Sequence, residues 1–244
     1  MVIIFFVMGL IFGSFYNVVA YRLSNNMSLV KPKRSICPKC KKELGILELI
    51  PIFSYIFLKG KCKKCHEKIS LFYPFIEFLT AFTFALSYHL CGFSLDLLIM
   101  LIMFSYFSIV IYSDFKYMII PDEVTFIVII LTVILILIKA LYWNVIVAFI
   151  TTISTYVFAK IISIILKKDA MGGGDIKLMF FVGLLLNYNA ILAFFISSFL
   201  AFPAAFYVTV KNKNSKIPFG PFLLLATILI YIFKLDLITI LSWL

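Results

Sequence analysis

Long apolar runs recur from one end of the chain to the other, and they limit its possible folds more than any other feature. A helix needs about 20 mostly apolar residues to cross the hydrocarbon core of a bilayer. The sequence is 64% hydrophobic and 14% charged, whereas soluble domains are typically about half apolar and a quarter charged. It therefore predicts an all-α polytopic membrane protein with about eight transmembrane helices. We expect them at roughly 2–20, 71–90, 95–113, 122–140, 143–166, 175–188, 190–210 and 219–242.

Two of these runs are unusual. The run at 2–20 lacks the charged start and the small-residue cleavage site of a signal peptide, so we expect a retained helix. The sixth run, at 175–188, has only about 14 residues, which is short of a full crossing. We therefore expect it to begin inside the membrane, where protein or a water-filled cavity must cover the irregular backbone.

Basic residues gather on one predicted side of the membrane. Of the 22 Lys and Arg residues, 12 lie between Arg22 and Lys68. Cytoplasmic loops are enriched in Lys and Arg, and this enrichment explains the net charge of +11 without a nucleic-acid partner. With the N-terminus outside, 20 of the 22 lie in or beside the predicted cytoplasmic loops at 21–70, 114–121, 167–175 and 211–218.

Four cysteines in the first of these loops form two C-x2-C pairs, "CPKC" and "CKKC". Each pair presents two thiolates from one tight turn, and two pairs supply the four ligands of a structural zinc ion. The alternatives are unligated thiols or two disulfides, although a reducing cytoplasm disfavours disulfides. We predict a zinc site at Cys37, Cys40, Cys62 and Cys65, and we expect Cys91 to be an isolated packing residue.

Only 11 residues are acidic, and most have a simple structural explanation. We expect the three in the basic loop to pair with lysines, and the two on the other side of the membrane to end solvated helices. These residues are Glu43, Glu48 and Glu67, and Asp96 and Asp236.

Four further acids lie on the predicted cytoplasmic side. Asp122 and Glu123 follow a proline at a predicted helix start, where acids complement the helix dipole. Asp169 follows two lysines, and a solvated ion pair explains it. Glu77 lies near the start of the second run, and we leave open whether it is a helix-start residue or a site residue.

The remaining two acids, Asp114 and Asp175, lie at the cytoplasmic ends of the third and sixth runs. Carboxylates inside a membrane are energetically unfavourable and usually functional. Two that approach one another can share a proton. The ionised group then activates a water, and the protonated group polarises the carbonyl that the water attacks.

Three glycines, Gly172, Gly173 and Gly174, precede Asp175 directly. We expect them to let the backbone turn tightly and approach a substrate strand without Cβ atoms. Two other functions stay open on the residues alone. One is a proton- or cation-coupled transporter that uses the Asp114 and Asp175 pair. The other is a noncatalytic scaffold that docks a partner through the zinc loop.

In order along the chain, these motifs resemble the bacterial prepilin leader peptidases, which are membrane aspartyl proteases of the G-x-G-D type. Asp114 opens "DFKYMIIPD", and Asp175 closes "GGGD". Lys116 stands where many members carry a second aspartate, which leaves Asp114 as the match. Further stretches that resemble the family are "GSFYNVVAYRL" at 13–23, "ELIPIFSYIFLKGKC" at 48–62, "ISLFYPFIE" at 69–77 and "IPFGPFL" at 217–223.

The resemblance implies an enzyme of the bacterial cytoplasmic membrane with Asp114 and Asp175 as its catalytic residues. Its substrates would be prepilins and pseudopilins, cleaved after a glycine at the cytoplasmic membrane face. Family members with the cysteine loop also methylate the new N-terminus, with S-adenosylmethionine as the methyl donor.

The resemblance also implies three parts. These are a first helix at 1–20, a zinc-binding loop domain for methyl transfer at 21–70, and a seven-helix protease domain at 71–244. Polar residues on the same face are candidates for methyl transfer or substrate binding, although packing, topology anchoring and helix capping explain them at least as well. The candidates are Asn17, Arg22, Glu48 and Glu77.

Overall fold

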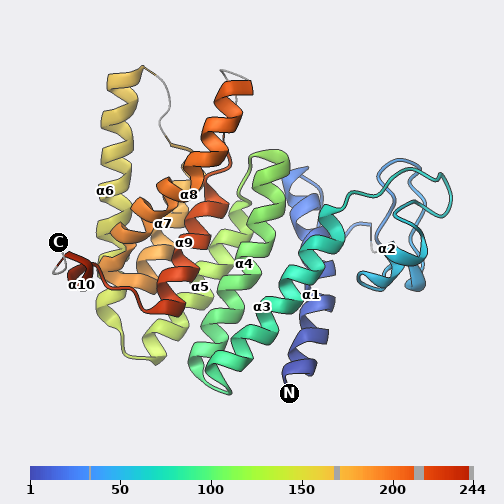
Figure 1. The fold of residues 1–244 in the computed structure, drawn as a ribbon, viewed down its shortest axis with the longest axis horizontal. Helices are drawn as coiled ribbons and strands as arrows, with labels where there is room; N and C mark the ends of the chain where they lie inside the picture. The colour runs from blue at the N-terminus through green and yellow to red at the C-terminus, as the bar shows by residue number, and fades with distance from the viewer. Residues whose placement is uncertain (33, 168–170, 212–216, 242–244) are drawn as a thin grey trace. The chain divides into compact units, whose positions relative to one another are not determined.

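The protein is nearly all helical in a computed structural model that describes residues 1–32, 34–167, 171–211 and 217–241. The contacts between residues divide the chain into two compact units, Met1–Ser113 and Asp114–Leu244. Eight long helices are described: α1 (Val2–Ser24), α3 (Phe72–Cys91), α4 (Leu95–Tyr117), α5 (Asp122–Ile138), α6 (Tyr142–Leu166), α7 (Gly173–Leu186), α8 (Ala190–Lys211) and α9 (Gly220–Phe233) (Figure 1). Short helical turns are η1 (Ile46–Glu48), α2 (Phe53–Phe57), η2 (Asn187–Asn189) and α10 (Leu237–Leu241).

Each expected apolar run overlaps one of these long helices, but the helix of the last run ends early. The helix α9 stops at Phe233 because Lys234 is left-handed, with φ of 51°. The N–H of Leu235 then donates to the carbonyl of Ile230 at 3.2 Å, which satisfies an end carbonyl of the helix. The expected span to residue 242 is therefore too long.

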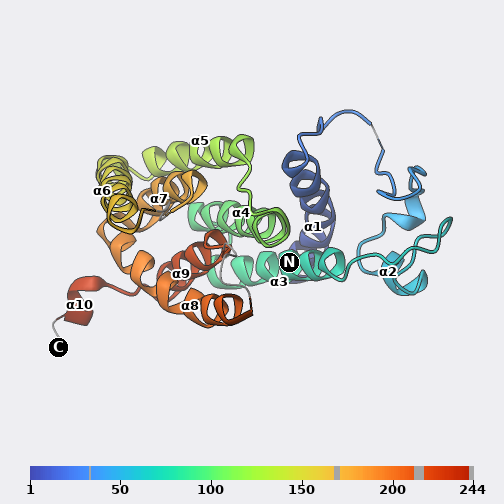
Figure 2. The ribbon, with the colours of Figure 1, turned by 90° about the horizontal axis from the view of Figure 1, so that it is seen from above.

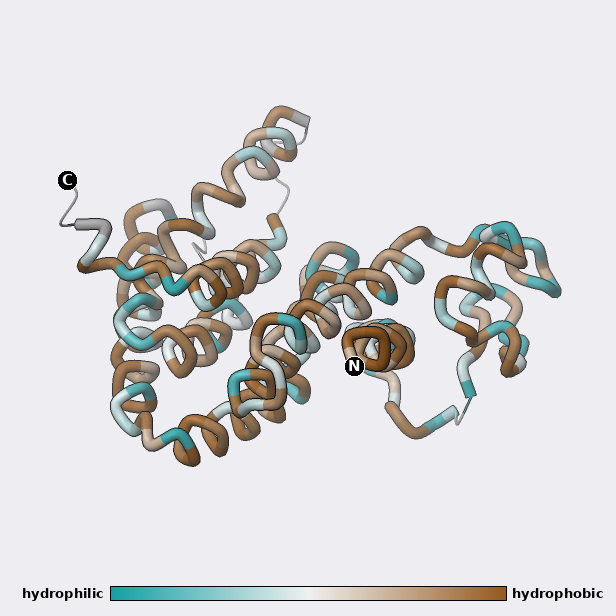
Figure 3. Tube along the Cα trace, turned by 60° about the horizontal axis from the view of Figure 1, so that its bottom comes forward, coloured by the Kyte–Doolittle hydropathy of each residue, from teal (hydrophilic) through white to brown (hydrophobic). Residues whose placement is uncertain are grey.

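The helices have the length and composition of a membrane protein. In the described part of the chain, four helical segments are long and apolar enough to cross a bilayer, and Gly220–Phe233 is a shorter apolar helix. Figure 3 shows hydrophobic residues along most of the helices, with hydrophilic residues recurring in the loops. The four segments are Val2–Ser24, Leu95–Tyr117, Tyr142–Ile165 and Gly173–Val208.

In the first unit, two glycines let α1 pack directly against the backbone of α3. A Cβ atom at Gly9 would lie 2.5 Å from the Cα of Ala81, and one at Gly13 would lie 2.8 Å from the Cα of Glu77. The residue numbers rise along α1 as they fall along α3, so the two helices are antiparallel. The spacing of four residues is that of the G-x-x-x-G motif, which brings membrane helices into close contact.

In the second unit, α7 is the central helix and contacts α5, α6, α8 and α9 (Figure 2). Leu178, Phe181 and Leu184 are completely buried along it. A Cβ atom at Gly183 would lie 2.7 Å from the Cα of Ala148 in α6, so these two helices also pack closely. Because α7 is held on several sides, the residues of its first turn have a well-defined position.

Candidate active site and metal centre

Asp114 lies in the last turn of α4 and is 6% exposed. Its Oδ2 atom accepts a hydrogen bond of 3.1 Å from the backbone N–H of Gly220. Gly220 is the first residue of α9, and the N–H groups of a first helical turn have no partner inside their own helix. The start of α9 therefore supplies the donor that this buried carboxylate needs.

Asp175 lies in the first turn of α7, three residues after Gly172, which precedes the helix. The backbone N–H of Gly172 donates to its carboxylate. This contact is half of a capping box, which by itself stabilises a helix start. The side chains of Asp175 and Asp114 are close enough for their charges to interact. The structure therefore brings the two predicted site aspartates together at the starts of two helices, α7 and α9.

The three glycines before Asp175 differ in their surroundings. A Cβ atom at Gly172 would lie 3.2 Å from Oδ2 of Asp175, and one at Gly174 would lie 3.1 Å from the Cβ of Ile120. A Cβ atom at Gly173 would meet nothing within 4 Å. This pattern explains why the motif G-x-G-D restricts the first and third positions and leaves the second one free.

Close approach, rather than an unusual turn, accounts for these glycines. Among the glycines that the structure describes, only Gly60 and Gly92 have a positive φ. The expected tight turn at 172–174 is therefore replaced by ordinary helix-start geometry. Ile120 is the side chain that comes close, since a Cβ atom at Gly220 would also lie 2.9 Å from its Cδ1.

Sequence reasoning missed Gly220 and Ile120 as parts of this site. The signal for Gly220 is "FGP" before an apolar run, because proline is favoured in the first turn of a helix. Ile120 lies within the quoted stretch "DFKYMIIPD", directly before Pro121, but nothing in that stretch predicts its contacts with the glycines.

Among the other acids near this site, Asp122 has the structural role that was predicted for it. Asp122 begins α5, and its Oδ1 lies 2.7 Å from Nζ of Lys177. Both side chains are about half exposed, so this is a solvated ion pair at a helix start. Asp169 lies outside the described residues.

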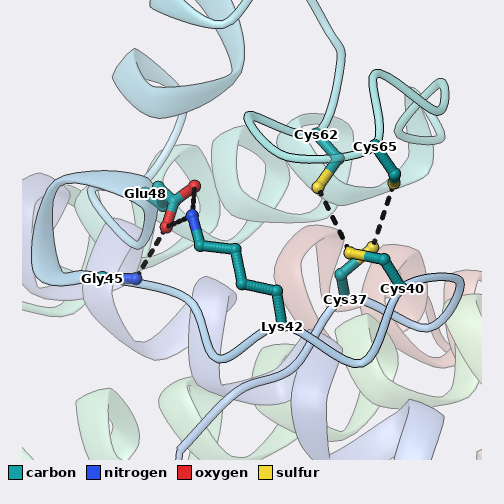
Figure 4. Close-up of polar contacts among 7 residues, drawn as sticks. All are labelled: Cys37, Cys40, Lys42, Gly45, Glu48, Cys62 and Cys65. Carbon is teal, nitrogen blue, oxygen red and sulfur yellow. Dashed lines mark hydrogen bonds and ion pairs between the residues drawn. The ribbon is translucent and has the colours of Figure 1, made fainter.

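The four loop cysteines form one cluster in the first unit (Figure 4). Their sulfur atoms all lie within 4.8 Å of one another. Two pairs face each other, Cys37 with Cys65 at 3.9 Å and Cys40 with Cys62 at 4.0 Å. A tetrahedral zinc ion with bonds of about 2.3 Å separates its sulfur ligands by roughly 3.8 Å, so this donor set fits such an ion. The geometry shows a four-cysteine cluster able to hold a metal, with free thiols rather than disulfides.

The backbone of the second knuckle favours a thiolate at Cys62. The N–H groups of Cys65 and Lys64 donate to its sulfur and lower the pKa of the Cys62 thiol to about 6. At Cys65 the N–H of Glu67 lowers the pKa, but burial and thiol contacts with the other cysteines outweigh it and raise that pKa to about 11. These backbone contacts favour the thiolate of Cys62, and a thiolate is the form that binds metals.

The glutamates of the loop are paired, as expected, with basic residues. Glu48 accepts the Gly45 N–H and lies 2.9 Å from Nζ of Lys42 (Figure 4), and these contacts hold the pKa of its carboxyl below its usual range. Glu67 pairs with Lys39 at 3.3 Å. The remaining one differs from the prediction, because Glu43 pairs with Arg34, an arginine rather than a lysine, at 3.6 Å.

The remaining methyl-transfer candidates have different surroundings in the first unit. Arg22 donates to the carbonyls of three loop residues, at 2.7 Å to Leu29 in the shortest bond. Glu77 accepts the Ile52 N–H at 2.7 Å. Asn17 donates to the Tyr73 carbonyl at 3.1 Å, while its Oδ1 is buried without a partner in the described part of the chain.

Two family descriptions match most of the chain between them. Residues 7–91 match the bacterial peptidase A24 N-terminal domain, and residues 101–206 match the type IV leader peptidase family. No solved structure matches the chain.

Several curated proteins are similar over nearly the whole length. A prepilin leader peptidase/N-methyltransferase of Bacillus subtilis (strain 168) is 34% identical, and the match covers 96% of this chain and 94% of that protein. A protein of the same name from Vibrio cholerae serotype O1 is 33% identical over 94% of this chain and 95% of its own length. Another from Neisseria gonorrhoeae is 32% identical over 92% and 88%. With similarity of this extent, the chain belongs to the type IV leader peptidase family.

Proposed function

We propose that this protein is a membrane aspartyl endopeptidase that removes the short basic leader of type IV prepilins and pseudopilins after a glycine. The observation that carries this proposal is the approach of Asp114 and Asp175 at the first turns of α9 and α7. Two carboxylates in such a setting suit hydrolysis of a peptide bond, and the family membership names the class of substrate. The transporter alternative has no support among the matching families and relatives.

The chemistry follows from the two carboxylates acting as one unit. The ionised member takes a proton from a water molecule, and the resulting hydroxide attacks the carbonyl carbon of the leader glycine. The protonated member donates a hydrogen bond to the carbonyl oxygen and then gives its proton to the leaving amine. The N–H groups of Gly220 and Gly172 hold the two carboxylates in place, and the dipoles of α9 and α7 favour negative charge there.

The site also needs room for an extended peptide. The backbone at Gly172–Gly174 presents no Cβ atoms, and Gly173 faces open space. We assign these glycines to the passage of the substrate strand beside Asp175. Ile120 lies against both Gly174 and Gly220, so we expect its side chain to shift when the substrate enters.

We place the eight long helices across the cytoplasmic membrane with the N-terminus outside and both aspartates at the cytoplasmic face. The asymmetric placement of Lys and Arg supports this topology. We further assign proteolysis to residues 71–244 and methyl transfer to the loop at 21–70, after the first helix at 1–20.

The second proposed activity is methylation of the amine that cleavage releases. S-adenosylmethionine supplies the methyl group in that reaction. We propose that zinc, held by the four cysteines, keeps the loop folded. The buried Oδ1 of Asn17 can accept a hydrogen bond from an N–H group, such as that of the amine that receives the methyl group. Arg22, Glu48 and Glu77 are engaged by the protein itself, and we assign them to shaping the loop.

A single assay tests both activities. Purified protein in detergent is mixed with a prepilin and S-adenosylmethionine, and the products are weighed by mass spectrometry. We expect release of the leader and a mass increment on the mature N-terminus. Cleavage by both Asp114→Asn and Asp175→Asn would refute the assignment of the aspartates. If the new N-terminal amine stays unmodified, the proposed methylation is refuted and the proposed leader cleavage is not.

The role of Asn17 has a matched control in Ser24, whose Oγ is also buried without a partner in the described residues. We expect Asn17→Ala to lower methylation while cleavage is retained, and Ser24→Ala to lower neither. Equal effects of the two substitutions on methylation would assign Asn17 to packing alone.

A further inference from the structure

The loop between α1 and α3 exposes an unusual number of large apolar side chains in the segment 46–57. Ile46 is 86% exposed, Leu47 78% and Phe57 80%. Contiguous exposed apolar surface of this kind usually marks an interaction site. The large apolar residues exposed in the segment are Ile46, Leu47, Leu49, Ile50, Phe53, Ile56 and Phe57.

Within this segment, the short helix α2 has an outward apolar face and an inward polar one. Phe53, Ile56 and Phe57 are exposed, and their spacing places them on the same side of the helix. Tyr55 points elsewhere, because its hydroxyl donates to the Ile69 carbonyl at 3.3 Å. The inward residue therefore attaches α2 to the loop, while the three apolar side chains are left facing outward.

A buried carboxylate attaches the segment to the transmembrane helices. Glu77, on α3, accepts the N–H of Ile52 at 2.7 Å. Ile52 has a φ of 62° and a ψ of −51°, the geometry of a tight γ-turn that is unfavourable for a β-branched residue. The Glu77 contact stabilises this conformation and fixes where α2 begins.

The same contact sets the height of the segment relative to the membrane. Glu77 packs against Gly13 of α1, and α1 is long and apolar enough to cross a bilayer. The loop leaves α1 after Ser24 and enters α3 at Phe72, so it is held at one end of this antiparallel pair. That end is where a crossing helix meets the headgroup layer.

The charges beside the segment suit a lipid surface. Lys41 precedes it, and Lys59, Lys61, Lys63 and Lys64 follow it, all exposed. Segments in which lysines flank apolar side chains typically insert at the boundary between the headgroups and the acyl chains of an anionic leaflet.

We propose that the segment 46–57 lies in the headgroup layer of the bilayer, with Ile46, Phe53, Ile56 and Phe57 inserted among anionic lipids. The four-cysteine cluster is then held at the membrane surface rather than free in the solvent. This proposal requires that α1 crosses the membrane, but it does not depend on either catalytic activity.

The experiment measures quenching of tryptophan fluorescence in the full-length protein in lipid nanodiscs. The two native tryptophans are first replaced by Trp143→Phe and Trp243→Phe. Phe57→Trp and Ile46→Trp then report from the segment in separate variants. Glu43→Trp is the control, because Glu43 is exposed in the same loop but outside the segment.

We expect lipids brominated on their acyl chains to quench the probes at 57 and 46 severalfold more than the probe at 43. Quenching at 57 and 46 should also be stronger with anionic than with zwitterionic lipids. Equal quenching at all three positions would overturn the proposal. So would a blue shift at 57 that appears only after a prepilin peptide is added, because the surface would then belong to the substrate. Two probe positions guard against the failure of one variant to fold.

Discussion

The four-cysteine cluster and the aspartate site differ in how the chain builds them. Each half of the cysteine cluster is a C-x2-C turn, and the facing residues Cys40 and Cys62 are 22 positions apart. The aspartate site instead joins Asp114 to Gly220 across 106 positions, and Asp175 comes from a third helix. The first site is therefore encoded by local spacing and the second by helix packing. The first should tolerate changes in packing, and the second should not.

The largest effect is expected from the removal of one carboxylate. Asp175→Asn keeps the side-chain size and leaves the loop of the first unit unchanged. General acid–base groups typically contribute 10²–10⁴-fold to a rate, so we expect leader release to fall by about that factor. Zinc content and methylation of a precleaved substrate should stay at the wild-type level. Loss of both activities together would show that the two sites are not separable.

The converse change removes a metal ligand. We expect Cys62→Ser to lower the zinc content from about one ion per chain towards zero, as measured by metal analysis. Methylation should be lost, because structural zinc sites supply folding free energy directly, while leader release is retained. Cys91→Ser is the matched control, since Cys91 lies outside the cluster and packs against Met100. A zinc-loaded Cys62→Ser protein would contradict the proposed ligand set.

Packing around the aspartates is tested by two alanine substitutions in adjacent glycines. Gly174→Ala forces a contact with Ile120, and overpacking of this kind typically destabilises by about 1–3 kcal/mol. Gly173→Ala meets open space, and in a helix alanine is favoured over glycine by about 1 kcal/mol. We expect a lower melting temperature for Gly174→Ala than for Gly173→Ala. Equal melting temperatures of the two variants would show that close approach does not explain the motif.

The smallest effect is expected at an acid beside the site but not in it. Asp122→Asn removes an ion pair with Lys177 whose side chains are 54% and 42% exposed. Exposed pairs contribute about 0.2–1 kcal/mol, so thermal unfolding should shift slightly and only at low salt. Leader release should be unchanged. A large loss of leader release would show that Asp122 belongs to the catalytic site.

The sequence predicted the parts of the molecule that depend on composition and spacing. The long helices and the four-cysteine cluster belong to this class, and the choice of Asp114 and Asp175 as a pair rests on the rarity of acids in apolar runs. It did not predict that α9 ends at Phe233. Lys234 adopts a left-handed conformation there, and the sequence has no glycine at this position to indicate the end of a helix. It did not identify Gly220 as a donor or Ile120 as a neighbour of two glycines, because both roles depend on how residues 114–120 meet the first turns of α7 and α9.

The hydrogen bond from Gly220 to Asp114 also has a consequence for the synthesis of the protein. A ribosome adds about 5–20 residues per second, and Gly220 follows Asp114 by 106 residues. For roughly 5–20 s the nascent chain therefore contains Asp114 without its donor. The proposed proteolytic centre is therefore completed only when α9 has been synthesised and inserted.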